Sequence, residues 1–141
     1  RAAEPKCRPT NVLPTKMNET KDLIEIQDFL HTILREACPP LQIRKEGEAG
    51  IEAAGTKEVM QGKQKVDGHY FASTVKKPKD IRFYFFAIYT DPQLFSLSED
   101  LKKMLKGKSC FHIKMLNDDI KEELRNMVSI AVKRFREKDL I

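Results

Sequence analysis

Residues 68–89 read GHYFASTVKKPKDIRFYFFAIY, and the hairpin that they predict sets the architecture of the chain. The two ends of this stretch, 68–75 and 81–89, are rich in β-branched and aromatic residues. Between them, 76–80 carries a proline and four charged residues, which favours a hairpin turn of about five residues. Apolar residues occupy both alternating faces of 81–89, so we expect a central strand covered on most of both faces.

A helix is predicted before this hairpin. Between residues 20 and 37, apolar side chains recur at steps of three and four, as on the buried face of a helix. Pro39 and Pro40 end the pattern. Two short strands are expected at 41–44 and 58–61. The predicted helix face consists of Leu23, Ile26, Phe29, Leu30, Ile33, Leu34 and Ala37.

A short helix is predicted after the hairpin. Asp91 followed by Pro92 is typical of a helix start, and Ser96 with Glu99 has the spacing of a capping box. Gly107 is expected to end this helix.

The chain then alternates as a strand over 109–114, and Asn117 is expected to cap a long amphipathic last helix. The order of elements predicts an α+β fold. An antiparallel sheet of about five strands would carry an N-terminal helix, a short helix and a long C-terminal helix packed on it.

Length and composition favour a single domain over 19–141, because 141 residues is close to the commonest domain size. Residues 1–18 are expected to be a flexible basic tail or a remnant of expression. No apolar run approaches the ~20 residues that span a bilayer, so no membrane association is expected. Three cysteines at long spacings predict no disulfide framework and favour a reducing, cytoplasmic location.

Positive charge gathers in the second half of the chain. Residues 57–82 balance at +4, and 102–114 contain five lysines without an acid, whereas 19–58 contain nine acids and five bases. Such a region can attract phosphates, acidic ligands or nucleic acid. Lysines also protect edge strands from aggregation, which is the alternative reading. The predicted basic patch consists of Lys76, Lys77, Lys79, Arg82, Lys102, Lys103 and Lys106.

Familiar catalytic motifs are weak here. Gly107, Lys108 and Ser109 match the end of a phosphate-binding P-loop, but they follow a predicted helix where a P-loop follows a strand. Cys110 and His112 share one face of a predicted strand, which would suit a thiolate and its base, although buried cysteines of this kind are mostly structural. We therefore expect no enzyme, no cofactor and no metal site.

The function predicted from these features is non-enzymatic binding of a small anionic or amphipathic ligand. Tyr84, Tyr89, Lys108 and His112 are the polar members of apolar strands, so they are placed at the mouth of a pocket. The alternative is a protein-interaction or self-association domain, in which the acidic and basic regions face each other in a homodimer. Nucleic-acid binding and a Cys/His-dependent enzyme rank below both.

The net charge of +5 does not by itself predict nucleic-acid binding. Residues 1–16 contribute +3 of it, so the remainder of the chain carries only +2. We expect binding to single-stranded DNA or RNA to be weak, salt-dependent and largely lost when residues 1–16 are removed.

One family resemblance accompanies these patterns. Residues 89–92 (YTDP), the helix that follows, and residues 107–114 (GKSCFHIK) before the last helix resemble the small bacterial YdhG-like proteins, over about residues 20–141. The resemblance implies a helix-backed antiparallel sheet without an established enzymatic activity. Some members are described as iron chaperones, yet no cluster of acids and histidines on one predicted face offers iron its hard ligands.

Overall fold

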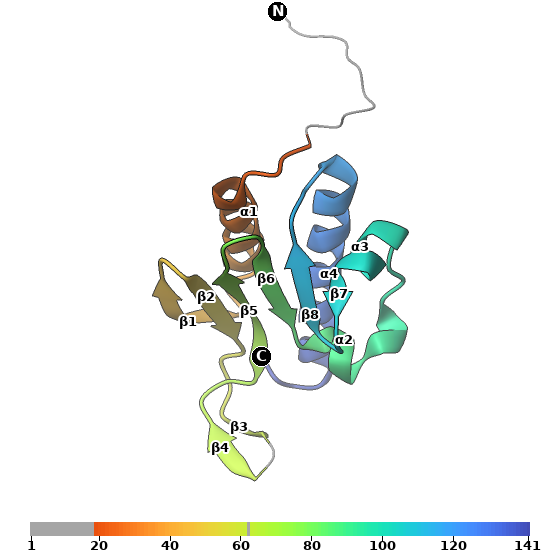
Figure 1. Cartoon of the computed structure of the whole chain (residues 1–141). Helices are drawn as coiled ribbons and strands as arrows, with labels where there is room; N and C mark the ends of the chain where they lie inside the picture. Colours follow the sequence, from red (N-terminus) through yellow and green to blue (C-terminus); the bar gives the residue numbers. More distant parts are fainter. Residues whose placement is uncertain (1–18, 62) are drawn as a thin grey trace, which may run out of the picture.

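A computed structural model describes residues 19–61 and 63–141, so the predicted tail at 1–18 lies outside the described residues. Figure 1 shows the elements in chain order. They are α1 (Leu23–Glu36), β1 (Gln42–Gly47), β2 (Gly50–Ala54), β3 (Val59–Gln61), β4 (Gln64–Val66), β5 (Tyr70–Lys76), β6 (Ile81–Phe85), α2 (Ala87–Thr90), the 3₁₀ helix η2 (Pro92–Leu94), α3 (Glu99–Met104), β7 (Leu105–Lys106), β8 (Cys110–Ile113) and α4 (Asp118–Glu137).

The predicted α+β fold is confirmed. Its main sheet has six antiparallel strands in the order β1-β2-β5-β6-β8-β7, where about five were expected. The hairpin in 68–89 is confirmed as β5 and β6, with Lys76 paired to Ile81 and the backbone N–H of Lys77 bonded to the carbonyl of Asp80 at 2.9 Å. β3 and β4 form a separate two-stranded ribbon that extends away from the main sheet (Figure 1).

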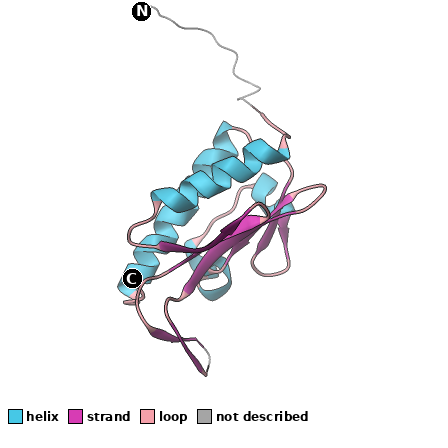
Figure 2. Cartoon of the chain, turned by 90° about the vertical axis from the view of Figure 1, so that its left-hand side faces the viewer, coloured by secondary structure: helices cyan, strands magenta, loops and turns pink. Residues whose placement is uncertain are grey.

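Both long helices cover the same face of the main sheet and leave the other face uncovered by helices (Figure 2). In β6 and β8, Phe83, Phe85 and Phe111 are fully buried beneath the helices, whereas Arg82 and Tyr84 on the opposite face remain half-buried. The expectation that both faces of this strand are covered is therefore wrong. The apolar residues that suggested it, Phe86 and Ile88, lie beyond the end of β6, in and before α2.

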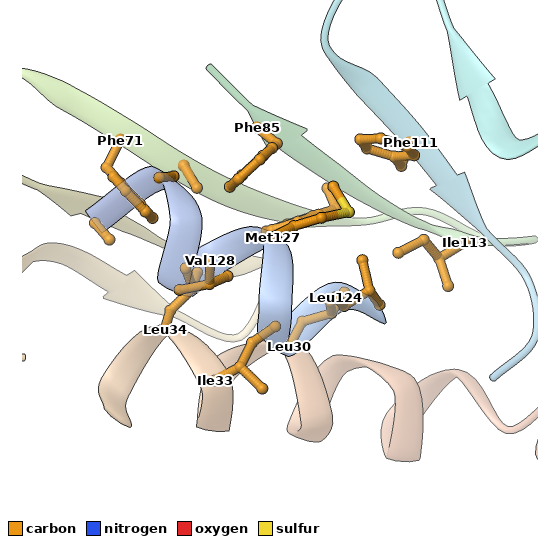
Figure 3. Packing of buried hydrophobic residues seen from close by; sticks show 14 of the residues in the cluster. Leu30, Ile33, Leu34, Phe71, Phe85, Phe111, Ile113, Leu124, Met127 and Val128 are labelled. Carbon is orange, nitrogen blue, oxygen red and sulfur yellow. The ribbon is translucent and has the colours of Figure 1, made fainter. Parts of the chain in front are cut away.

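The core lies between this face and the two helices (Figure 3). Each large apolar side chain buried there stabilises the fold by about 1.5–3 kcal/mol relative to an exposed position, before entropy is counted. Figure 3 labels Leu30, Ile33 and Leu34 of α1, Leu124, Met127 and Val128 of α4, and Phe71, Phe85, Phe111 and Ile113 of the sheet.

Of the helix caps predicted from the sequence, the one for α4 is confirmed and the one for α3 is wrong. Asn117 caps α4 as predicted, because its side-chain oxygen accepts a hydrogen bond from the backbone N–H of Ile120 at 2.9 Å. The capping box at Ser96 is wrong: Ser98 caps α3 and accepts from the backbone N–H of Leu101 at 3.3 Å. Ser98 is extended and directly precedes the helix, which is the geometry that a cap requires.

Two more local expectations are corrected. Asp91 does precede a helical turn, η2, but its side chain makes no capping bond. Gly107 does not end α3, which stops at Met104; it lies in the turn between β7 and β8 with φ of +73°, a conformation that glycine adopts without strain. In the part of the chain that the structure describes, no helix is long and apolar enough to cross a membrane.

Candidate functional site

A cavity of about 630 Å³ lies beside the sheet, where the chain leaves β6 and returns as β8. The chain makes an excursion between these strands, and this excursion surrounds the cavity. It consists of α2, η2, the segment 95–98, α3 and β7. The wall is apolar over most of its area, with two lysines at its edge. The lining residues are Ile88, Tyr89, Pro92, Phe95, Ser96, Leu97, Lys102, Leu105 and Lys108.

Tyr89 and Lys108 meet at this cavity. The ammonium of Lys108 lies 5.7 Å from the centroid of the Tyr89 ring, within the range of a cation–π interaction. Tyr89 is 51% exposed, which is unusual for a large aromatic side chain in an otherwise filled fold. Lys102, the second lysine of the wall, pairs with Glu99 at 3.4 Å, whereas no carboxylate in the described residues pairs with Lys108.

The apolar wall is held in place by the core. Phe95 packs edge-on against the buried ring of Phe85, with 5.4 Å between ring centroids. Tyr89 in turn packs against Phe86 at 5.8 Å. The two aromatic sides of the cavity are thus fixed by contacts to the end of β6 and do not depend on a ligand for their position.

Asp91 anchors the same excursion to α4. Its buried carboxylate accepts hydrogen bonds from Lys138 Nζ at 2.7 Å, Thr90 Oγ1 at 2.9 Å and Arg134 Nε at 3.2 Å. Burial raises the pKa of Asp91, but these hydrogen bonds, that of Lys138 first, outweigh it and hold the pKa below its usual value. The carboxylate is therefore ionised at neutral pH and fixes the start of the cavity wall at Pro92.

The other two residues predicted for the pocket lie elsewhere. Tyr84 and His112 are on the open face of the sheet, where Tyr84 is paired across the strands with Cys110. Of the four predicted residues, the structure brings together Tyr89 and Lys108 and separates both from Tyr84 and His112. Tyr84 and Tyr89 are an odd number of positions apart, so strand alternation alone points them to opposite faces. β6 also ends at Phe85, so Tyr89 lies outside the sheet, in α2.

His112 lies beside a buried carboxylate. Its Nδ1 is 3.7 Å from Oδ2 of Asp80, and the other oxygen of Asp80 accepts from Arg82 Nε at 3.2 Å. Burial and the Arg82 guanidinium lower the pKa of His112, and the raising effect of Asp80 does not offset them. The ring is neutral at physiological pH in the absence of a further anion.

Cys110 lacks the environment of a catalytic thiol. Burial raises the pKa of its thiol and outweighs the hydrogen bond with Tyr84 that lowers it. A nucleophilic cysteine requires the opposite, a lowered pKa with access to substrate. Within residues 19–61 and 63–141, no group of three His, Cys, Asp or Glu side chains is placed to hold a metal ion.

The predicted basic patch is divided among three places. Lys77, Lys79 and Arg82 line one cavity of the open side, and Lys103 and Lys106 line a second. Lys102 belongs instead to the apolar cavity. Lys76, at the end of β5, lines none of these three cavities.

Sequence reasoning missed the apolar half of the main cavity, namely Phe95, Leu97 and Leu105. A signal was present, since Phe95 and Leu97 are large apolar residues in an irregular segment that has no helical or strand period. Apolar residues in such a segment must cover something, either the core or a ligand.

Comparison with protein-family models, with curated proteins and with solved structures finds no match to this chain. The resemblance to the YdhG-like proteins stays a prediction.

Proposed function

We propose that the protein binds a small organic anion with an apolar body in the cavity between α2 and α3. The observation that carries this proposal is the ammonium of Lys108 over the exposed ring of Tyr89, at the mouth of a cavity with an apolar wall. An apolar wall with a few polar groups is the usual composition of a small-molecule site, and about 630 Å³ lies within the usual range of volumes.

The charges favour an anion over a neutral ligand. Both charged residues of the wall are lysines, and no acidic residue lines the cavity. Lys102 already forms an ion pair with Glu99, so Lys108 supplies most of the electrostatic attraction for an anionic ligand. A carboxylate or sulfonate at Lys108 would leave the ligand's apolar body against Phe95, Leu97 and Leu105.

The lining supports binding rather than catalysis. Ser96 is its only hydroxyl besides Tyr89, and no histidine or carboxylate lies among the lining residues to act as a base. A hydroxyl nucleophile such as Ser96 needs an adjacent base to be activated, so we expect a ligand in this cavity to be held and released unchanged.

Two ligands of matched shape test the proposal. Naphthalene sulfonate carries the charge and the apolar body, and naphthyl methanol has the same ring system without the charge. Isothermal calorimetry should give an affinity for the sulfonate at least about tenfold above that for the alcohol, the factor expected from one partly desolvated charge contact.

Variants locate the binding. Lys108→Gln should remove the preference for the sulfonate, and Tyr89→Ala should weaken both ligands. Lys133→Gln, an exposed lysine of α4 that does not line the cavity, is the control and should change neither affinity. Equal affinities for the two ligands, or equal effects of the variants at Lys108 and Lys133, would contradict the proposal.

A further inference from the structure

A second, strongly cationic surface lies where β6 begins and β8 ends, on the open side of the sheet. One cavity of about 370 Å³ is bounded by the turn between β5 and β6, and another of about 270 Å³ by α3 and β7. Lys114, directly after β8, lines both of them and joins them into one surface. We call this surface the Lys114 groove; its cations are Lys77, Lys79 and Arg82 on one side, Lys103 and Lys106 on the other, and Lys114 between.

The positive charge of the groove is largely uncompensated. Asp80 lies within it, but its buried carboxylate is already bonded to Arg82 and faces His112. In the described part of the chain, none of the groove's five lysines has a carboxylate within ion-pair distance. Only one other acid, Asp100, lines the groove, so five lysine charges stand against one carboxylate.

The imidazole of His112 lies among the same lysines. Lys106 and Lys114 line the same cavity as His112, and after burial and Arg82 they also lower the pKa of its ring. Lysines from separate elements, β7 and the end of β8, therefore converge on one point of the groove. Repulsion between them is a cost that an anion bound among them would relieve.

The lining differs from that of the apolar cavity. Met104 and Pro78 are the only lining residues with apolar side chains, and the imidazole of His112 is the only aromatic ring. Most of the lining side chains are cations, and ammonium groups are suited to phosphate oxygens as separate point charges. Two cavities on either side of a shared lysine fit an anion whose charges are spread along a chain.

We propose that the Lys114 groove binds an oligophosphate, a short chain of phosphates linked by anhydride bonds. The phosphates would extend from the β5–β6 turn across Lys114 to Lys103 and Lys106. This site is separate from the cavity of the proposed function, and neither depends on the other, because no residue lines both.

The test uses sodium tripolyphosphate as the probe and the full chain, at physiological ionic strength. Calorimetry should give tripolyphosphate an affinity at least about tenfold above that of orthophosphate, since several ammonium groups can be engaged at once. Lys114→Gln, at an exposed position where folding should be unaffected, should lower the affinity about tenfold, and Lys133→Gln should not. A thermal melt of each variant confirms that it is folded.

A second readout follows His112 by NMR. Tripolyphosphate should raise the pKa of the His112 ring, because the bound anion offsets the lysines around it, and should leave the buried His31 ring unchanged. Naphthalene sulfonate should not compete with tripolyphosphate, which keeps this site distinct from the apolar cavity.

Three results would overturn the proposal. Binding that is equal for orthophosphate and tripolyphosphate excludes a site built for linked phosphates. Binding that survives in Lys114→Gln places the phosphate elsewhere, including on the basic residues before residue 19. Tighter binding of a thymidine oligonucleotide than of tripolyphosphate, with the same loss in Lys114→Gln, would assign the groove to a nucleic-acid backbone.

Discussion

The carboxylate of Asp91 accepts a hydrogen bond from Lys138 Nζ at 2.7 Å, joining two positions 47 residues apart. Through this contact and the neighbouring bond from Arg134, the segment that carries Tyr89 and Pro92 is attached to the end of α4. The buried side chain of Asp91 therefore couples the cavity to the end of the last helix.

Replacing Asp91 should be costly. Asp91→Ala removes the buried acceptor of the partly exposed Lys138 and Arg134, so we expect it to lower the free energy of unfolding by about 2 kcal/mol. Glu36→Ala, which removes the exposed ion pair of Glu36 with Arg125, is the control and should cost less than about 1 kcal/mol. Urea denaturation measures both, and equal effects would show that the Asp91 contacts do not stabilise the fold.

Stability should fall as the pH drops below about 6.5, the usual pKa of histidine, because of His31. Burial, and after it Arg35, lowers the pKa of this ring, so the unfolded chain takes up a proton before the folded protein does. In the fold, Nε2 of His31 lies 2.9 Å from Oγ1 of Thr74, which already accepts the backbone N–H of Ile51 at 3.1 Å. The Thr74 hydroxyl can donate its proton to Nε2 only while that nitrogen is unprotonated, so protonation of the ring removes this hydrogen bond.

His31→Gln tests this origin of the pH dependence. An amide in place of the ring can keep a bond to Thr74 but does not titrate. Between pH 7 and pH 5, the free energy of unfolding of the variant should fall less than that of the unchanged protein, by urea denaturation at each pH. An unchanged slope would assign the effect to another group.

Gly107 should resist substitution although space surrounds it. A methyl group there would meet no atom within 4 Å, but φ of +73° is a conformation that L-residues adopt only with strain. Gly107→Ala should therefore cost about 1 kcal/mol. Gly47→Ala, with the same open surroundings and no positive φ, is the matched control and should change the melting temperature little in either direction. A similar loss at both positions would contradict the assigned cause.

Cys110 should react slowly with iodoacetamide at neutral pH. Its thiol is half-buried and its pKa is raised, so both access and thiolate fraction are reduced. Mass spectrometry of digested samples can compare the alkylation rate at Cys110 in native and in urea-unfolded protein. Faster reaction in the native protein would restore the Cys/His-dependent enzyme as a candidate.

The sequence predicted the elements whose pattern is long or chemically distinctive. The three-and-four spacing in α1 and α4 and the charged turn between β5 and β6 each reflect a simple rule of burial or turn chemistry, and all three are confirmed. β2 was missed because its small residues, Gly50, Ala53 and Ala54, give no clear alternation, although both alanines are fully buried and Ala53 belongs to the core.

The residues that line the cavity could not be predicted from local sequence patterns. Strand alternation over 81–89 placed Tyr84 and Tyr89 on opposite faces, and it gave no sign that the strand ends at Phe85 and that Tyr89 belongs to α2. Ser96 and Ser98 are two residues apart and either could precede a helix, so the choice of cap depends on where the chain turns. Residues that line a pocket together come from several elements, and no local pattern relates them.

The two long helices of the core, α1 and α4, come from opposite ends of the described chain, and the segments that precede them are hydrogen-bonded to each other. Thr20, before α1, exchanges backbone hydrogen bonds of 2.7 and 2.9 Å with Leu116, before α4. A folding chain must therefore bring segments almost a hundred residues apart together before Leu30 and Leu124 can share a core. Closing so long a loop lowers the chain entropy before the stabilising contacts between the helices can form, so folding should be slow for a domain of this size. Its rate should also respond strongly to changes in either helix.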